Sequence, residues 1–159
     1  MQYTFFGLPL HPLVIHLTVV LVPLVALALA LQALVPRTRR QLRLATLAGS
    51  LVAVATVFVT TESGDRLRRQ LPVNDLVERH AALGNQLRWF TIGLAVVAIV
   101  LFALTSPQAR PDRVKVALVA VSVLTVLLSA VTVVQVVRIG HSGATAAWEG
   151  IANLPVRPG

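Results

Sequence analysis

The stretch PLVIHLTVVLVPLVALALALQALV, residues 12–35, contains no aspartate, glutamate, lysine or arginine. A helix needs about 20 consecutive apolar residues to cross the hydrocarbon core of a bilayer. The stretch meets this length, and its only polar side chains are His16, Thr18 and Gln32. It therefore predicts a membrane-spanning helix.

Three further segments of the chain have the same character. With the first they predict an all-α fold, a four-helix transmembrane bundle that makes one membrane domain over residues 1–159, with helices at about 12–35, 42–61, 75–105 and 114–139. The third helix is longer than a bilayer core requires, so we expect it to extend beyond the bilayer on the outer side. In that extension Leu76, His80 and Leu83 share one face, which points His80 toward the protein.

The composition supports a membrane protein and excludes several kinds of site. Of 159 residues, 56% are hydrophobic and 13% are charged, about half the charged share of a soluble domain. There is no cysteine, which excludes disulfides, thiolate metal sites, iron–sulfur clusters and covalently attached haem. The only methionine is Met1, so we do not expect a copper site with a methionine ligand.

The net charge of +8 comes from basic residues in short loops between apolar segments, a distribution that membrane topology explains. We therefore expect the lipid bilayer as a partner and no nucleic acid. The loops at 36–43 and 106–115 hold seven arginines and lysines and one acid, Asp112. The opposite side also holds seven arginines, but with five acids. Short loops that are rich in Lys and Arg face the cytoplasm. We therefore predict a multi-pass protein with both termini outside.

The four histidines of the chain, His11, His16, His80 and His141, all fall at the outer end of the predicted bundle. An ionisable side chain close to the hydrocarbon indicates a functional site. Imidazole is a common ligand for iron, copper and zinc. Glu62, at the predicted end of the second helix, adds a carboxylate at the same level.

Two site chemistries fit these residues. The first is haem b, with His16 and His80 as the better pair of axial ligands, His11 and His141 nearby, and Arg88 and Arg138 close to the propionates. The second is a compact zinc, copper or non-haem iron site made by the histidines and Glu62. Each histidine also has a structural interpretation, as a residue at a helix end or as a hydrogen-bonding group between helices.

Glycine-containing segments are expected to end two of the helices. Glu62-Ser63-Gly64-Asp65 follows the second helix, and Gly140-His141-Ser142-Gly143 follows the fourth. The repeated Ser-Gly pair suggests a duplicated two-helix unit. Small residues at helical spacing predict close packing of these two helices; they are Thr46, Gly49, Ala53, Thr56 and Thr60 in the second and Ser122, Thr125, Ser129 and Thr132 in the fourth.

Four motifs resemble a bacterial membrane family known as domain of unknown function 2231. They are HPLVIH with the preceding Gly7 and Pro9, TTESGDRL, ERHAALG and GHSGATAAWEG, and together they extend from Gly7 to about Gly150. The resemblance implies four helices, a bacterial inner-membrane location and a family pattern that includes His11, His16, His80 and His141. Relatives are fused to Rieske-type domains or found near cytochromes, which implies an electron-transfer setting with a separate Rieske or cytochrome partner for this chain.

These features lead to one main hypothesis and two alternatives. The main hypothesis is a b-type haem or redox-metal protein that transfers electrons near the outer face, alone or as a homo-oligomer. The first alternative is a non-redox metal-binding or transport protein. The second is a cofactor-free structural subunit of a larger membrane complex. The sequence contains no hydrolase or transferase motif, so an electron-transfer component is the one enzyme-related role we expect.

Overall fold

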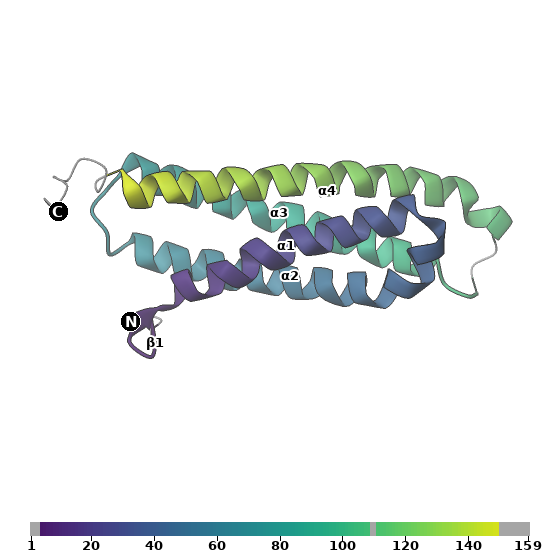
Figure 1. The fold of residues 1–159 in the computed structure, drawn as a ribbon, viewed down its shortest axis with the longest axis horizontal. Helices are drawn as coiled ribbons and strands as arrows, with labels where there is room; N and C mark the ends of the chain where they lie inside the picture. Colours follow the sequence, from purple (N-terminus) through teal and green to yellow (C-terminus); the bar gives the residue numbers. More distant parts are fainter. Residues whose placement is uncertain (1–3, 109–110, 150–159) are drawn as a thin grey trace, which may run out of the picture.

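The chain folds into four long helices that run up and down beside one another (Figure 1). The computed structural model describes residues 4–108 and 111–149. The helices are α1 (Leu10–Leu34), α2 (Arg39–Arg68), α3 (Asp75–Leu104) and α4 (Pro111–Trp148). The predicted all-α, four-helix fold is therefore confirmed, while the extent of the domain to residues 1 and 159 lies outside the described residues.

The helices close into a bundle because the last one returns to the first. Helix α1 packs on α2 and α4, and α3 also packs on α2 and α4, whereas the diagonal pairs make little contact. Short connections between consecutive helices produce this arrangement of antiparallel neighbours. Helix α1 and helix α3 therefore face each other across the centre of the bundle.

Two small elements lie outside the four helices. Before α1, the strands β1 (Thr4–Phe5) and β2 (Leu8–Pro9) form an antiparallel hairpin. Its turn has φ of 50° at Phe6 and 79° at Gly7, the left-handed conformations that a tight hairpin turn requires and that glycine adopts without strain. Between α1 and α2, the segment predicted as a basic loop is partly ordered as the short helix η1 (Pro36–Thr38).

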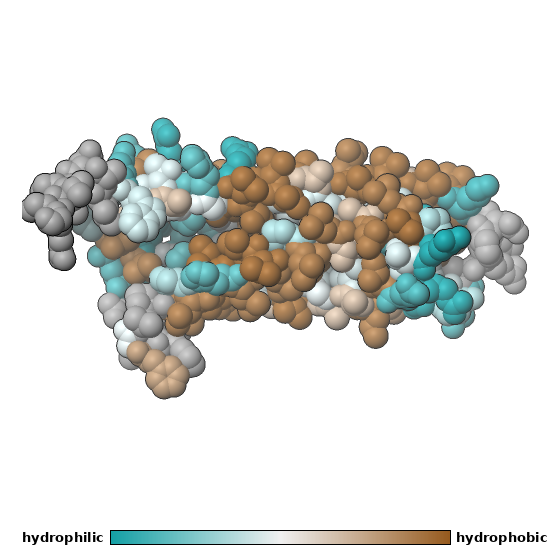
Figure 2. Space-filling view, in the orientation of Figure 1, coloured by the Kyte–Doolittle hydropathy of each residue, from teal (hydrophilic) through white to brown (hydrophobic). Residues whose placement is uncertain are grey.

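All four helices are long and apolar enough to cross a membrane. Figure 2 shows apolar residues around the middle of the visible face and hydrophilic residues at both ends. Many large aliphatic side chains of the helices are more than half exposed, among them Val20 at 67%, Leu24 at 60% and Leu127 at 60%. Such a surface suits lipid rather than water, so the chain is a membrane protein embedded in a bilayer.

The interior of the bundle follows a seven-residue repeat. In α1 the buried residues include Thr18, Val25 and Gln32, and in α3 they include Leu87, Leu94 and Leu101. Residues seven apart return to nearly the same side of a helix. The repeat therefore defines which side of each helix faces its neighbours.

Polar groups inside the bundle bond mainly to helix carbonyls. The hydroxyls of Thr125 and Thr132 each donate to the carbonyl four residues earlier, at 2.7 Å. Bonds between helices also form inside the bundle: the Thr46 hydroxyl donates to Gln32 Oε1 at 2.6 Å, and the hydroxyl oxygens of Thr18 and Thr60 lie 2.7 Å apart. These bonds satisfy hydroxyls that have no water to contact, and they let α2 and α4 present small residues to their neighbours.

Two predicted helix ends are wrong. Helix α2 continues through Glu62-Ser63-Gly64-Asp65 to Arg68, and α4 continues through Gly140-His141-Ser142-Gly143 to Trp148. The serines do not break the helix, because Ser63 donates to the Thr60 carbonyl and Ser142 to the Ile139 carbonyl, both at 2.9 Å. Glycine is unfavourable in a helix by only about 1 kcal/mol, which packing against other helices offsets.

The other two helices are close to their predicted bounds. Helix α3 begins at Asp75 as predicted, although its N-cap is Asn74, whose side chain accepts a bond from the Leu76 amide at 2.8 Å. Helix α1 begins two residues earlier than predicted, at Leu10. The projection of α3 beyond the bilayer stays a prediction.

Substituting Thr46→Val is expected to destabilise the protein by about 1 kcal/mol, because Gln32 Oε1 loses its buried donor. The measurement is the free energy of unfolding in mixed detergent micelles. The matched control is Thr56→Val, whose hydroxyl donates to the Ala53 carbonyl of its own helix at 3.0 Å. Equal losses for the two variants would show that the bond between α1 and α2 contributes nothing specific.

Candidate functional site

His11, near the start of α1, is held against α2. Its Nδ1–H donates to the Thr60 carbonyl at 2.9 Å. The ring lies directly on Gly64, where an added Cβ would come within 2.9 Å of the imidazole Cε1. No other residue could occupy position 64 without moving the ring. The carbonyl and the glycine of α2 thus define the orientation of this histidine.

His80 of α3 is held against α4 in the same manner. Its Nδ1 lies 3.1 Å from the Ser142 hydroxyl oxygen. An added Cβ at Gly143 would come within 2.9 Å of the His80 Cε1. The hydroxyl hydrogen of Ser142 is already donated to the Ile139 carbonyl, so the serine oxygen accepts from His80 Nδ1–H. The contact between α3 and α4 therefore repeats the contact between α1 and α2.

The two rings face each other across the bundle. Their centres are 6.4 Å apart and their planes are inclined at 74°. Because Nδ1 carries the hydrogen in both rings, Nε2 of each neutral imidazole is left with a free lone pair. Histidines that bind metals use this pattern, in which a hydrogen bond from one ring nitrogen orients the other as ligand.

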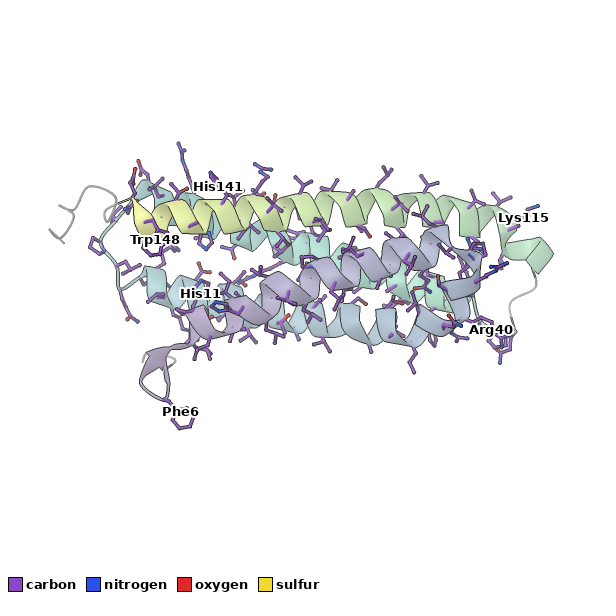
Figure 3. All side chains as sticks on the ribbon, viewed as in Figure 1. Phe6, His11, Arg40, Lys115, His141 and Trp148 are labelled. Carbon is purple, nitrogen blue, oxygen red and sulfur yellow. The ribbon has the colours of Figure 1, made fainter. Side chains whose placement is uncertain are left out.

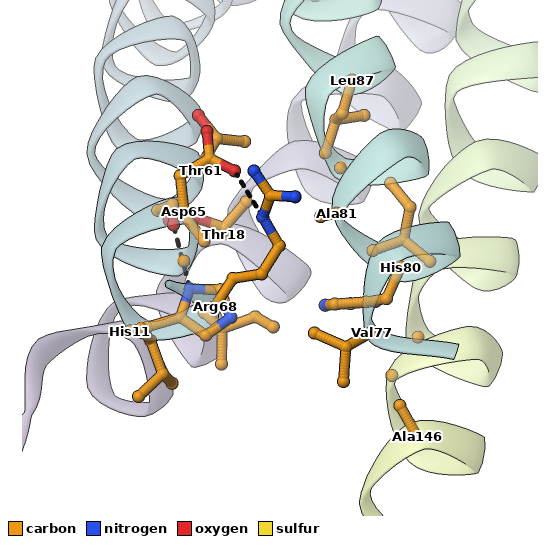
Figure 4. A pocket seen from close by; sticks show the side chains of 18 of the residues that line it. His11, Thr18, Thr61, Asp65, Arg68, Val77, His80, Ala81, Leu87 and Ala146 are labelled. Atoms are coloured by element: carbon orange, nitrogen blue, oxygen red, sulfur yellow. Dashed lines mark hydrogen bonds and ion pairs between the residues drawn. The ribbon is translucent and has the colours of Figure 1, made fainter. Parts of the chain in front are cut away.

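Both rings line a cavity of about 440 Å³ at this end of the bundle. Figure 4 shows His11 and His80 entering it from different helices. The remaining wall is mostly apolar or small and comes from all four helices; it includes Ile15, Val57, Gly64, Ala81, Gly84, Leu87, Val136, Gly140, Gly143 and Ala144. The volume is within the range of pockets that hold small molecules and cofactors, about 300–1,000 Å³.

A charged group borders the cavity. Arg68 lines it and pairs with Asp65 of its own helix, with 3.6 Å between Arg68 Nε and Asp65 Oδ1 (Figure 4). Arg68 Nη1 also lies 2.5 Å from Glu78 Oε2 of α3. The arginine thus joins α2 to α3, and its ion pair with Asp65, which also lines the cavity, borders a mostly apolar space.

The structure does not bring the other predicted ligands into this cavity. His16 was predicted to be a ligand together with His80, but it is exposed and its Nδ1–H donates to the Pro12 carbonyl at 2.6 Å. His141 and Glu62 are also exposed, and Glu62 pairs with Arg66 at 3.2 Å. Within residues 4–108 and 111–149, no group of three or more histidine, aspartate or glutamate side chains could hold a metal ion.

The two arginines expected near a propionate lie elsewhere. Arg88 is half-buried, where its Nε donates to the Thr61 hydroxyl at 2.7 Å and its guanidinium lies 5.1 Å from the centre of the Phe58 ring. Arg138 is exposed and donates to Gln135 Oε1 at 3.4 Å. Arg68 takes the position beside the cavity that was assigned to them.

Sequence reasoning missed Gly64, Gly143 and Arg68, and it chose His16 over His11. The seven-residue repeat of buried positions is the feature that distinguishes His11 from His16. His11 lies seven residues before Thr18, and His80 lies seven before Leu87, so both histidines continue a buried row. His16 is on no such row.

Comparisons with known proteins give one match. A family model described as "Predicted membrane protein (DUF2231)" covers residues 7–153. No curated protein and no solved structure matches the chain. Gly150, the last residue of the fourth motif, lies outside the described residues.

Gly64→Ala and Gly143→Ala are each expected to destabilise the protein by about 1–3 kcal/mol, because the added methyl overlaps a histidine ring that is fixed by its Nδ1 bond. The measurement is the thermal unfolding midpoint in detergent. The matched control is Gly140→Ala, since a Cβ there meets nothing within 4 Å and alanine favours a helix by up to about 1 kcal/mol. A similar change at all three positions would contradict the prediction.

Proposed function

This chain belongs to the DUF2231 family of predicted membrane proteins, and on that premise we propose that it binds one haem b through His11 and His80 and transfers electrons near the outer face of a bacterial inner membrane. The proposal replaces His16 with His11 as the partner of His80. The observation that carries it is the pair of Nε2 atoms on the two sides of one apolar cavity, each freed by an Nδ1–H bond.

The number of ligands favours haem over a bare metal ion. A structural zinc site uses four protein ligands, and a catalytic one uses three. Haem iron takes most of its ligands from its own ring, so one or two protein side chains would be enough to hold it. The described residues offer two histidines at the cavity and no third histidine or carboxylate that completes a metal site with them.

The separation of the rings agrees with a shared ligand. Their centres are 6.4 Å apart, so a group bound between them would be within reach of both histidines.

The walls of the cavity support a flat apolar cofactor. Glycines and alanines on α2, α3 and α4 leave space where larger side chains would fill it. Arg68 would pair with a propionate in exchange for Asp65 or Glu78, since arginine binds carboxylates through two parallel hydrogen bonds. When bound, haem would supply reversible one-electron exchange at its iron, and the chain would hold and orient it and exclude water.

The outer-face assignment rests on the charges at the two ends. His11 and His141 lie at the end of the bundle opposite Arg40 and Lys115 (Figure 3). The loops at the Arg40 end are the compact ones that the positive-inside rule places in the cytoplasm. A redox partner such as a Rieske protein or a cytochrome would then approach from outside and would be a separate chain.

The visible spectrum of protein purified from haem-sufficient cells tests the cofactor. We expect a Soret band, low-spin α and β bands after reduction, and one iron per chain. His11→Ala and His80→Ala should lose the low-spin bands, because each variant removes one of the two histidines that would hold the haem.

The matched controls are His16→Ala and His141→Ala, whose rings lie outside the cavity, and they should keep the wild-type spectrum. Wild-type protein without a Soret band, even after reconstitution with haem, would refute haem binding. Stoichiometric zinc or copper in that preparation would support the metal-binding alternative, and neither metal nor haem would support a structural subunit.

The orientation can be tested with single cysteines, because the chain has none of its own. Val73→Cys lies in the exposed connection between α2 and α3, at the histidine end, and Arg40→Cys lies at the other end. In intact spheroplasts a membrane-impermeant maleimide should label Val73→Cys, whereas Arg40→Cys should react only after lysis. The reverse pattern would place the histidines on the cytoplasmic side.

A further inference from the structure

A second cavity, of about 270 Å³, lies at the end of the bundle opposite the histidines. Leu34 of α1 and Arg39 of α2 form one side, and residues of α4 between Val119 and Leu127 form the other. It is separate from the histidine cavity, with which it shares no lining residue. The cofactor proposed above therefore makes no use of it.

Two polar atoms of residues that line this cavity are buried without a hydrogen-bond partner. They are Nε of Arg39 and the hydroxyl oxygen of Ser122. Arg39 is held in place, because its Nη2 donates to the Ala33 carbonyl at 3.0 Å. A buried polar group without a partner is unfavourable by about 1–3 kcal/mol. Arg43 Nε, Arg68 Nε and Ser129 Oγ also have no hydrogen-bond partner, but only Arg39 and Ser122 line this cavity, on two of its sides. A ligand that accepts hydrogen bonds would satisfy both residues.

Arg39 is the charged residue in the lining of this cavity, and its guanidinium favours an anion. The two connecting segments at this end contain seven arginines and lysines and a single acid, Asp112. Figure 3 shows Arg40 and Lys115 at this end, and Figure 2 shows hydrophilic residues over it. Basic pockets between membrane helices on the cytoplasmic side bind anionic lipid headgroups.

The rest of the cavity wall is apolar and continues onto the lipid-facing surface. Leu34, Val119, Val123 and Leu127 are 56–66% exposed. An acyl chain lying along α4 would cover these side chains while a phosphate at its head reaches Arg39 and Ser122. A free phosphate would leave the apolar wall uncovered, so the combination favours a lipid.

We propose that this cavity binds the phosphate of an anionic phospholipid, with Arg39 Nε and Ser122 Oγ as donors and the apolar strip of α4 as the surface for an acyl chain. The site is independent of haem binding. It would fix one lipid at the boundary between α1, α2 and α4.

Native mass spectrometry of the purified protein tests this proposal. The protein in neutral detergent is mixed with phosphatidylglycerol or with phosphatidylcholine of the same acyl chains, and the bound lipid is counted. Wild type should retain phosphatidylglycerol in preference. Arg39→Gln should lower its affinity about fivefold, the factor for about 1 kcal/mol per cation near a lipid surface.

The matched control is Arg40→Gln, which makes the same change in net charge at an exposed neighbour outside the cavity, and it should retain the wild-type preference. Arg39→Lys keeps the charge and should keep most of the binding. If Arg39→Gln does not fold, Ser122→Leu is the variant to test instead. The leucine fills the cavity without changing the net charge, so this variant should also reduce phosphatidylglycerol binding.

Three results would overturn the proposal. The first is equal retention of the two lipids by wild type. The second is an equal loss in Arg39→Gln and Arg40→Gln, which would show a diffuse charge effect rather than a site. The third is displacement of phosphatidylglycerol by millimolar inorganic phosphate or glycerol phosphate, which would identify a free anion as the ligand.

Discussion

Inside a bilayer no water is available to bond the amides and carbonyls of the backbone, so each must be satisfied within the protein. Four long helices meet this requirement with bonds inside each segment, and loops are confined to the ends of the bundle. The hydroxyls of α2 and α4 follow the same rule, because most of them donate to carbonyls of their own helix. Helices that satisfy their own polar groups can pack closely through small residues, and close packing is what forms this bundle.

The candidate site depends on two backbone carbonyls that accept side-chain hydrogen bonds in addition to any bond within the helix. The Thr60 carbonyl receives the Ser63 hydroxyl and His11 Nδ1. The Ile139 carbonyl receives the Ser142 hydroxyl, whose oxygen in turn contacts His80 Nδ1. Both arrangements exist only because α2 and α4 continue as helices past these positions. Had the helices ended at Glu62 and Gly140, neither ring would be oriented toward the centre.

The fold was predictable from the sequence, and most of the site was not. Hydropathy alone located four spans, and the predicted start of α3 at residue 75 is confirmed, with Asn74 as its N-cap. The serine and glycine residues after Thr61 and Ile139 suggested that the helices end there. The helices continue because a neighbouring helix packs a histidine ring onto each glycine, which local sequence cannot show. Choosing between His11 and His16 required knowing which side of α1 is buried. Thr18 is on that side, and His11, seven residues earlier, shares it. The pairing of Arg68 with Glu78 depends on the contact between two helices and has no local signal.

The repeated contact between histidine and Ser-Gly has a consequence for symmetry. Exchanging α1–α2 with α3–α4 maps each helix contact of the bundle onto another, and it maps His11 onto His80 and Gly64 onto Gly143. Such an exchange is a half-turn about an axis along the bundle, and the axis passes between the two rings. The two halves of the cavity present the same imidazole groups but differ in two ways. His11 donates to the Thr60 carbonyl whereas His80 contacts the Ser142 hydroxyl, and the charged residues Asp65 and Arg68 line only the side formed by α2.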